Sequence, residues 1–506
     1  MENTIKSDNK LVLGANYILG AIILVYLFLT LSFGRGFSII SIGPIFITEI
    51  VLLFALIFIA INIKSLSAIP RNFVIFLSVY FSFYSLHMAM SLLGANFNSL
   101  RDIVFFGYIV FLPAFFIISC TKKRLVLFSN IIILTNVIGL MLTRLSMYRQ
   151  FPVFEGLTYW WSQTRAFNYL VYYSFSLAFL VSFFFLSKKK IYKMLIALLC
   201  SWNLYTIIMW GSRTGWLACF VLGLFLLVMF GRRIFNFLLY FIPIFIVAST
   251  LMGYFVDRDV FLEKVNSPKL ESLKFFIQEK FFDIEPAYPA DIEEIKSNSS
   301  GSKETETGEV LAPEAKPIEK IKIMKGYDRL KNKLIVEKIA IPDGATKTKL
   351  IRNRDYFANI AWRLNMWTHL LDFGIESPIL GRGLGVHYRK LHLLHDSREL
   401  KTKSFFTPAH NHIISVFYKT GFIGLGLFIF INVYAFLYGF TYLKECRDIF
   451  IKHFLMGVLG SFVAWHAMAF FFNVIDSPPT SIFLWILIGL IFACIKADNN
   501  GLAQAK

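Results

Sequence analysis

TPAHNHIISVFYKTGFIGLG, residues 407–426, passes from polar sequence into a hydrophobic run that continues well beyond it. The stretch has two histidines on either side of an asparagine, and it ends in apolar residues spaced by Gly421, Gly424 and Gly426. Small residues at such positions let one membrane helix pack closely against another. We therefore expect a membrane-spanning helix to enter the bundle here, with the histidines at its mouth.

Hydrophobic runs of this kind recur along the chain. Of its 506 residues 57% are hydrophobic and 56 are phenylalanine, and the mean hydropathy is +0.62. A water-soluble core cannot hold so much apolar surface, whereas a bilayer can, and one crossing takes roughly 20 apolar residues. The sequence predicts an all-α polytopic membrane protein with about twelve transmembrane helices. Their runs begin near Leu11, Pro44, Phe73, Ile103, Leu125, Asn168, Met194, Thr214, Asn236, Gly421, Phe454 and Ser481.

The distribution of lysine and arginine predicts the orientation. Basic residues gather in alternate connections, at 6–10, 64–71, 121–124, 187–193, 232–233, 444–452 and 496–506. By the positive-inside rule both termini then lie in the cytoplasm. Much of the net charge of +19 is in this view a topology signal, and nucleic-acid binding is not expected. No cleavable signal peptide is expected, because the first apolar run is long enough to remain as a span.

One connection, from Asp257 to Ala409, is long, polar and rich in acidic residues. The alternation places it outside the cytoplasm. Residues 285–317 are rich in Glu, Pro, Ser and Gly and predict a flexible insertion, whereas 260–282 and 356–375 predict amphipathic helices. The expected domains are 1–256 with transmembrane helices 1–9, 257–410 as a large periplasmic loop, 411–496 with transmembrane helices 10–12, and 497–506 as a cytoplasmic tail.

Two arginines occupy positions that suit phosphate binding. Arg213, in GSRTGW, lies at the outer junction between two apolar runs. An arginine at bilayer depth normally faces a partner or a wet cavity. It either reaches toward lipid headgroups or binds phosphate, whose oxygens match the guanidinium fork. Arg363 shares a helical face with Trp367, and it is either a surface arginine on an aromatic ring or a ligand-binding group.

Glycines and histidines follow Arg363. SPILGRGLG, residues 377–385, predicts a tight turn that lets backbone approach a ligand, with Arg382 inside it. Its GxGxG spacing is not a dinucleotide fingerprint. The nearby histidines are either interfacial surface residues, or include a general base for a sugar hydroxyl, or bind zinc. Their HxxH and HxH spacings and the lack of cysteine in this loop disfavour zinc and extracellular disulfides. These histidines are His387, His392, His395, His410 and His412.

Taken together, these motifs resemble a known family. RLNMWTHLLDFGIESPILGRGLG followed by HNHIISVFYKTGFIGLGLF resembles the paired motifs of the O-antigen ligase / O-antigen polymerase (Wzy-type) superfamily. The shared pattern is R-x3-W, P-x-x-G-x-G-x-G, H-N and G-x-x-G in this order. GSRTGW resembles the family's Ser-Arg junction between two earlier spans, and SQTRAFNYLVYYSFSLAFL loosely resembles another of its segments. The resemblance is strong over residues 205–220 and 360–430.

The resemblance implies a GT-C-like inverting glycosyltransferase of the bacterial inner membrane, with its active site on the periplasmic face. Such enzymes pass a glycan from undecaprenyl diphosphate to an acceptor sugar hydroxyl without cofactor or metal. Carried over to this sequence, His410 is the catalytic base, and Arg213 and Arg363 bind the diphosphate. Arg382, Asn411 and His412 are possible accessory residues. The implied partners are the undecaprenyl-diphosphate-linked oligosaccharide, an acceptor glycan or lipid A–core, membrane lipids and other polysaccharide-assembly proteins.

Three functions remain open from the sequence. We favour polymerisation of O-antigen or surface-polysaccharide repeat units. An O-antigen ligase that transfers the glycan to lipid A–core shares the same motifs. A lipid-linked glycan transporter or flippase would also have about twelve spans, but we would expect repeated halves and charges in the middle of spans. A zinc-dependent membrane hydrolase would depend on the histidine pairs alone.

Overall fold

The computed structural model describes residues 2–33, 37, 41–42, 45–94, 102, 107–147, 167–209, 213–253, 335–340, 346–351, 358–385, 409–472, 474–475 and 478–505. Contacts divide the chain into two compact units. The larger unit comprises Met1–Leu251, Tyr356–Leu393 and Glu399–Lys506, and the smaller comprises Met252–Asp355 and Leu394–Arg398. The predicted insertion at 285–317 and the predicted helix at 260–282 lie outside the described residues.

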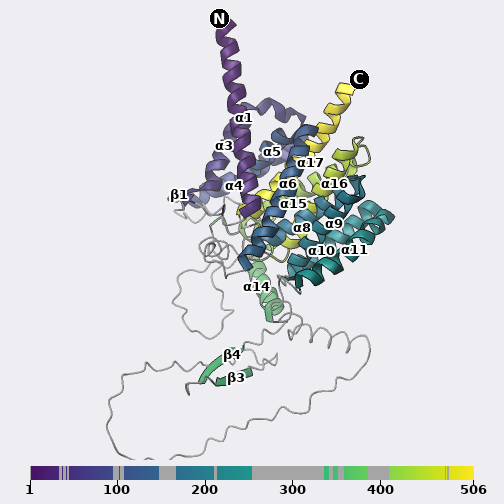
Figure 1. Ribbon diagram of the computed structural model, residues 1–506. Helices are drawn as coiled ribbons and strands as arrows, with labels where there is room; N and C mark the ends of the chain where they lie inside the picture. Colours follow the sequence, from purple (N-terminus) through teal and green to yellow (C-terminus); the bar gives the residue numbers. More distant parts are fainter. Residues whose placement is uncertain are drawn as a thin grey trace, which may run out of the picture. The chain divides into compact units, whose positions relative to one another are not determined.

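The larger unit is a bundle of α-helices (Figure 1). They are α1 (Glu2–Phe33), α3 (Ile47–Ile61), α4 (Arg71–Leu93), α5 (Phe111–Ser119), α6 (Lys122–Met147), α8 (Phe167–Leu186), α9 (Lys190–Met209), α10 (Arg213–Phe230), α11 (Ile234–Leu251), α14 (Ala358–Ile375), α15 (His412–Tyr442), α16 (Ile449–Ala469) and α17 (Pro478–Ala505). Single 3-10 turns lie at η1 (Ile63–Ala68), η3 (Gly107–Val110) and η5 (Gly231–Arg233). A minimal antiparallel hairpin pairs β1 (Ser41–Ile42) with β2 (Ile45–Phe46).

The helices confirm an all-α polytopic membrane protein. Among the described residues, eight helical stretches are long and apolar enough to cross a membrane. One of them, Thr214–Leu251, contains both α10 and α11, and three shorter apolar helices lie at Ile47–Ile61, Gly107–Ser119 and Val171–Leu186. This part of the chain therefore holds the expected number of apolar helices, although how many of them cross the membrane stays a prediction.

The described part of the smaller unit is a β-hairpin, which the sequence did not predict. Strand β3 (Ile335–Ala340) pairs antiparallel with β4 (Thr346–Ile351), in a register that runs from Ile335↔Ile351 to Ala340↔Thr346. We expected a flexible insertion and flanking amphipathic helices in this long connection, and no strand. The predicted helix over 356–375 is present as α14, and it belongs to the larger unit.

Side-chain exposure in the larger unit fits a lipid environment. The apolar stretch of α17, Thr480–Gly501, is 94% buried and forms the centre of the bundle. In contrast, Phe220 on α10, Val228 on α10 and Leu239 on α11 are 64%, 74% and 73% exposed. Large apolar side chains are rarely displayed to water in such numbers, whereas lipid accepts them without cost.

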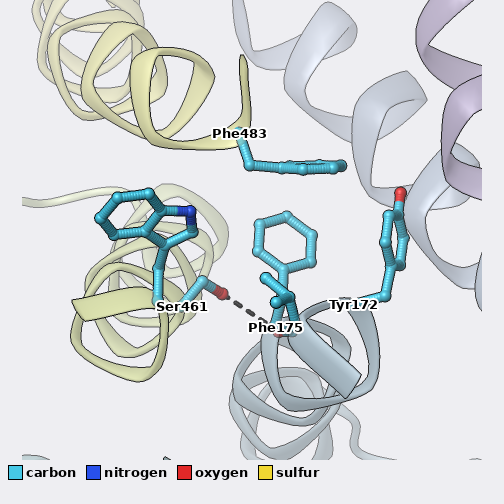
Figure 2. Close-up of a pocket in the computed structure, with 6 residues that line it drawn as sticks. Tyr172, Phe175, Ser461 and Phe483 are labelled. Atoms are coloured by element: carbon cyan, nitrogen blue, oxygen red, sulfur yellow. Dashed lines mark hydrogen bonds between the residues drawn. The ribbon is translucent and has the colours of Figure 1, made fainter. Parts of the chain in front are cut away.

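Small residues on α16 let it pack tightly against α8. A Cβ added to Gly457 would press on the Phe179 side chain, so glycine is needed for this close approach. One turn further, the Ser461 hydroxyl donates to the Phe175 carbonyl oxygen at 3.0 Å. Figure 2 shows this contact, with the Phe483 ring of α17 lying over it. The surrounding side chains leave no room for a water molecule. This dry contact fixes α16, whose C-terminal half borders the site described next.

Candidate functional site

Helix α15 is sharply bent near its start. The rings of His412 and Phe428 lie only 5.9 Å apart between centroids, whereas a straight helix would separate positions sixteen residues apart by about 24 Å. The bend is at Gly421, whose φ of 63° and ψ of −164° are accessible essentially to glycine alone. The histidines thus precede a span, as expected, but the sequence did not predict the bend: a short segment, 412–420, lies beside the longer segment, 422–442.

The glycine-rich turn is bonded to this bend. Residues 378–383 and 418–423 form four backbone hydrogen bonds with each other: Arg382 N to Tyr418 O at 2.9 Å, Gly383 N to Lys419 O at 3.0 Å, Phe422 N to Pro378 O at 2.7 Å and Ile423 N to Ile379 O at 3.3 Å. They satisfy backbone groups that the bend leaves without helical partners. We call this contact the interlock. The turn was expected to approach a ligand, but its close partner here is the α15 backbone.

The three glycines of α15 differ in role. A Cβ on Gly421 would overlap the Ile379 carbonyl within the interlock, and one on Gly424 would overlap the Thr420 side chain. A Cβ on Gly426 would meet nothing within 4 Å. Close packing was expected at all three positions. It is confirmed at Gly421 and Gly424 and wrong at Gly426, where no described residue lies within 4 Å of an added Cβ.

A buried ion pair secures the same region. Lys419 Nζ lies 2.6 Å from Asp102 Oδ1, and the two side chains are 1% and 3% exposed. The other carboxylate oxygen, Oδ2, accepts a hydrogen bond from Gly385 N at 2.7 Å. A buried charge without its partner is strongly destabilising, so each group requires the other. Asp102 thereby ties the end of the glycine-rich turn to α15 just before the bend.

Helix α14 runs parallel to the first segment of α15. The Trp367 indole N–H donates to the Ala409 carbonyl oxygen at 2.8 Å, and one to two turns later Gly374 touches the Phe417 ring. Both helices therefore begin at the same end of this pair. The start of α15 is capped by Asn411, whose Oδ1 accepts from the backbone N–H groups of the second and third helical residues at 2.9 and 3.1 Å.

His410 and Arg363 meet at this end. His410 is half-buried and directly precedes the capping asparagine, and its φ of 51° is left-handed. Burial, and then the Arg363 guanidinium, lower the pKa of His410 from 6.5 to about 4. The ring of Phe472, just beyond α16, lies 6.3 Å from the His410 ring. The structure thus brings together the predicted base and one predicted phosphate ligand, with the imidazole neutral at physiological pH.

Arg382 lies elsewhere. Its Nε donates to the Phe373 carbonyl oxygen at 2.9 Å, and its guanidinium forms an ion pair with Glu376. Both partners are at the C-terminal end of α14. Arg363 is ten residues before Phe373, or about 15 Å along the helix. Arg382 is therefore placed to cap α14 rather than to share an anion with Arg363.

His412 faces into the helical bundle and meets a residue that sequence reasoning missed. It is 3% exposed, and its Nε2 lies 3.4 Å from Nδ1 of His466 on α16. A histidine inside an apolar span is itself a signal of function or close pairing. That signal could have singled out His466, but its pairing with His412, 54 positions away, is not readable from local pattern.

These two histidines border an apolar cavity of about 660 Å³ between α10, α15 and α16. Asn432 is the third strongly polar residue among those that line it. The remaining lining residues are Leu217 and Val221 of α10, Ile413, Phe428, Ile429, Val433, Phe436 and Leu437 of α15, Phe462, Val463 and Ala467 of α16, and Phe470 and Phe471 just after α16. The volume is within the range of small-molecule sites, ~300–1,000 Å³, but the lining is much more apolar than recognition of a sugar would need.

Two of the three predicted chemical residues belong to segments that line this cavity, and the third lies on a helix that contacts its wall. Arg213 begins α10, and the structure describes its backbone only; Leu217 and Val221 follow it at one and two turns on the same face. His410 precedes the cavity residues His412 and Ile413. The indole of Trp367, one turn after Arg363, lies 6.0 Å from the ring of Phe471 in the cavity wall.

Of the other predicted histidines, His387, His392 and His395 lie outside the described residues. Within the described ranges, no group of three or more His, Cys, Asp or Glu side chains is arranged to hold a metal ion. The expectation that the site needs no metal therefore stays a prediction.

Part of the chain matches a protein-family model. Residues 195–429 match a family model described as O-antigen ligase. The matched range contains α10, α14, the interlock and the His410–His412 segment. No curated protein matches the chain.

Proposed function

Because the chain belongs to the O-antigen ligase family through its residues 195–429, we propose that it transfers a glycan from undecaprenyl diphosphate to the hydroxyl of an acceptor sugar. The observation that carries the proposal is the pairing of a neutral histidine, His410, with Arg363 beside an apolar cavity. A donor with a long apolar chain and an anionic diphosphate needs these two environments side by side.

The chain of the donor fits the cavity by chemistry. A polyprenyl chain has no groups that hydrogen-bond strongly, and the cavity wall is almost wholly aliphatic and aromatic. Helices α10 and α15, which follow Arg213 and His410, line the cavity, and α14, which carries Arg363, contacts its wall through Trp367 and Phe471. The N-terminal ends of α14 and α15 lie at the same end of this helix pair, near Arg363 and His410. The two helix dipoles therefore add to the positive potential of the arginine at that end.

The reaction is proposed to follow from this arrangement. His410, neutral at physiological pH, takes the proton of the acceptor hydroxyl while that oxygen bonds to the anomeric carbon. The bond from this carbon to the diphosphate oxygen breaks on the opposite face, so the configuration inverts. Undecaprenyl diphosphate leaves with increased negative charge, which Arg363 and Arg213 stabilise. Guanidinium groups thus supply the positive charge that a metal ion supplies in other transferases.

We propose polymerisation of O-antigen or surface-polysaccharide repeat units as the physiological reaction. The family description favours the second candidate, an O-antigen ligase that uses lipid A–core as the acceptor. Either reaction is assigned to the periplasmic face of a bacterial inner membrane, with both termini in the cytoplasm, on the basis of the charge distribution.

A deletion strain tests the proposal. It is complemented with Arg213→Ala, Arg363→Ala or His410→Ala, and the surface glycan is separated on a gel. His453→Ala is the matched control, because His453 lies near the N-terminal end of α16, whereas the cavity is bordered by the C-terminal half of that helix. A polymerase defect leaves single-repeat glycans on the anchor, and a ligase defect leaves glycan on the carrier lipid.

Purified protein completes the test. Transfer from a synthetic undecaprenyl-diphosphate glycan should fall by about 100-fold or more in the His410 variant, within the range lost when a general base is removed. Treatment with EDTA should leave the rate unchanged. A full glycan ladder from all three alanine variants would contradict the assignment. Glycan movement across vesicles without bond transfer would instead support a transporter.

A further inference from the structure

One indole links the helix that carries Arg363 to the peptide that carries His410. The Trp367 N–H donates to the Ala409 carbonyl oxygen at 2.8 Å. Ala409 is fully buried, in a small cluster with Met366 and Leu370 of α14. Because this carbonyl belongs to the peptide that joins Ala409 to His410, the hydrogen bond fixes the plane from which the His410 backbone continues.

His410 requires such support. It is the sole residue other than glycine with a positive φ in the described part of the chain. A residue other than glycine relaxes from this backbone conformation to a negative φ unless contacts on both sides of it hold the backbone in place. On the C-terminal side, Asn411 is fixed as the cap of α15. On the N-terminal side, the bond from Trp367 is the matching constraint.

The same indole reaches the cavity wall. Its ring lies 6.0 Å from Phe471, and the next residue, Phe472, lies 6.3 Å from the His410 ring. Trp367, on α14, therefore contacts both the peptide before His410 and the segment just after α16. A change in its position would move His410 relative to both Arg363 and the cavity.

We propose that Trp367 is a positioning residue that holds His410 beside Arg363. The proposal rests on the proposed function, in which His410 is the base, and it adds a residue that exchanges no proton itself. Trp367 acts through the Ala409 carbonyl, and its fourth-position spacing from Arg363 sets both groups on one face of α14.

The charges around His410 define a direct readout. Arg363 on α14 is the charged group coupled to it. The neighbour of His410 from the segment after α16 is Phe472, which is uncharged. The nearby histidine of α15, His412, has its ring turned toward His466. Moving His410 away from Arg363 and toward water should therefore raise its pKa from about 4 toward the ordinary 6.5.

The test replaces Trp367 by Phe, which keeps an aromatic ring and removes the N–H. The ring protons of His410, assigned with His410→Gln, are titrated by NMR in purified, detergent-solubilised protein. Trp367→Phe should raise the midpoint of His410 by one pH unit or more. It should lower kcat on the order of 10- to 100-fold, with the donor KM changed less than about threefold.

Trp202→Phe is the matched control, because its buried indole N–H has no hydrogen-bond partner among the described residues. It should leave the His410 midpoint unchanged. A midpoint that is also unchanged in Trp367→Phe overturns the positioning role, whether or not activity falls. The NMR readout does not depend on turnover. Transfer activity that does not depend on His410 would therefore refute the proposed function without deciding whether Trp367 positions His410.

Where Trp367→Phe does not fold, the wild-type chain supplies the measurement. The Trp367 indole N–H resonance should shift with the same midpoint as the His410 ring, because the two are joined through one peptide. An indole N–H that is insensitive to pH between 3 and 7, while His410 titrates, would overturn the proposal.

Discussion

At the scale of single residues, the environment of His410 sets the pH range of the site. The left-handed backbone turns the side chain back toward α14, where burial and the Arg363 guanidinium disfavour the imidazolium. Its pKa of about 4 keeps the His410 imidazole neutral across the physiological range. The residue is thus always ready to accept a proton, although it is a weaker base than an exposed histidine.

The pH profile should report this environment. We expect kcat/KM to remain flat as pH falls through 6.5 and to decline with a midpoint near 4, where His410 binds a proton in the free enzyme. In the unfolded chain the same histidine titrates near 6.5, so it binds more protons than the folded state between the two values. Stability should therefore decrease as pH falls through this window. A midpoint at 6.5 for transfer, with protein still folded, would contradict the described environment.

Sequence reasoning reached these residues by motif and stopped at their geometry. It named His410 and Arg363, and the structure places them within electrostatic reach of each other. It noted that Trp367 shares a face with Arg363, but nothing local to Trp367 indicates a carbonyl 42 positions away. It named Arg382 as a possible accessory residue because Arg382 lies inside the glycine-rich turn, whereas its guanidinium bonds at the C-terminal end of α14. Periodicity is a local property, and side-chain partners depend on tertiary packing.

At the scale of elements, the bend in α15 is the feature on which the site depends. A straight helix from His412 would carry the histidine far from Phe428 and from α16. The interlock stabilises the bent form, because the glycine-rich turn satisfies backbone groups on both sides of Gly421. The two glycine motifs that the sequence shows separately, GxGxG and GxxG, are thus two halves of one contact.

Substitution of the bend glycine should unfold this contact. Gly421→Ala places a Cβ against the Ile379 carbonyl in a backbone region essentially closed to alanine. We expect a loss of at least about 2 kcal/mol of stability, seen as a lower melting temperature in detergent. Gly426→Ala is the control five residues away, where a Cβ meets nothing within 4 Å. Similar melting temperatures for the two variants would show that the interlock does not hold α15.

At the scale of the whole molecule, the cavity lies next to the candidate site. It is enclosed by α10, α15 and α16, and two of the candidate chemical residues, Arg213 and His410, lie at or just before the first turns of α10 and α15. The distribution of apolar runs predicted most of these helices, because length and hydropathy are visible in sequence. The cavity was not predicted, since it depends on where α10, α15 and α16 fail to fill the space between them. The β3–β4 hairpin was also missed, because its short mixed strands lack a clear alternating pattern.

Filling the cavity should discriminate donors by chain length. Val433→Trp adds bulk to its lining. We expect the KM for an undecaprenyl donor to rise by about tenfold, an effect of roughly 1.4 kcal/mol on binding. A donor with a single short prenyl unit should be affected much less. Leu239→Trp on α11, which is 73% exposed and away from the cavity, is the control. Equal effects on long and short donors would contradict occupation of the cavity by the chain.

The interlock also bears on how this architecture varies over evolution. Between Leu251 at the end of α11 and Ala358 at the start of α14 lies a long segment, and a shorter one separates Gly385 from Ala409. The bundle holds the ends of both, so their closure entropy changes only by about 0.6 kcal/mol for each doubling of length. The length of either segment can therefore change over evolution at small cost in stability, while the contacts among α10, α14, α15 and α16 are kept.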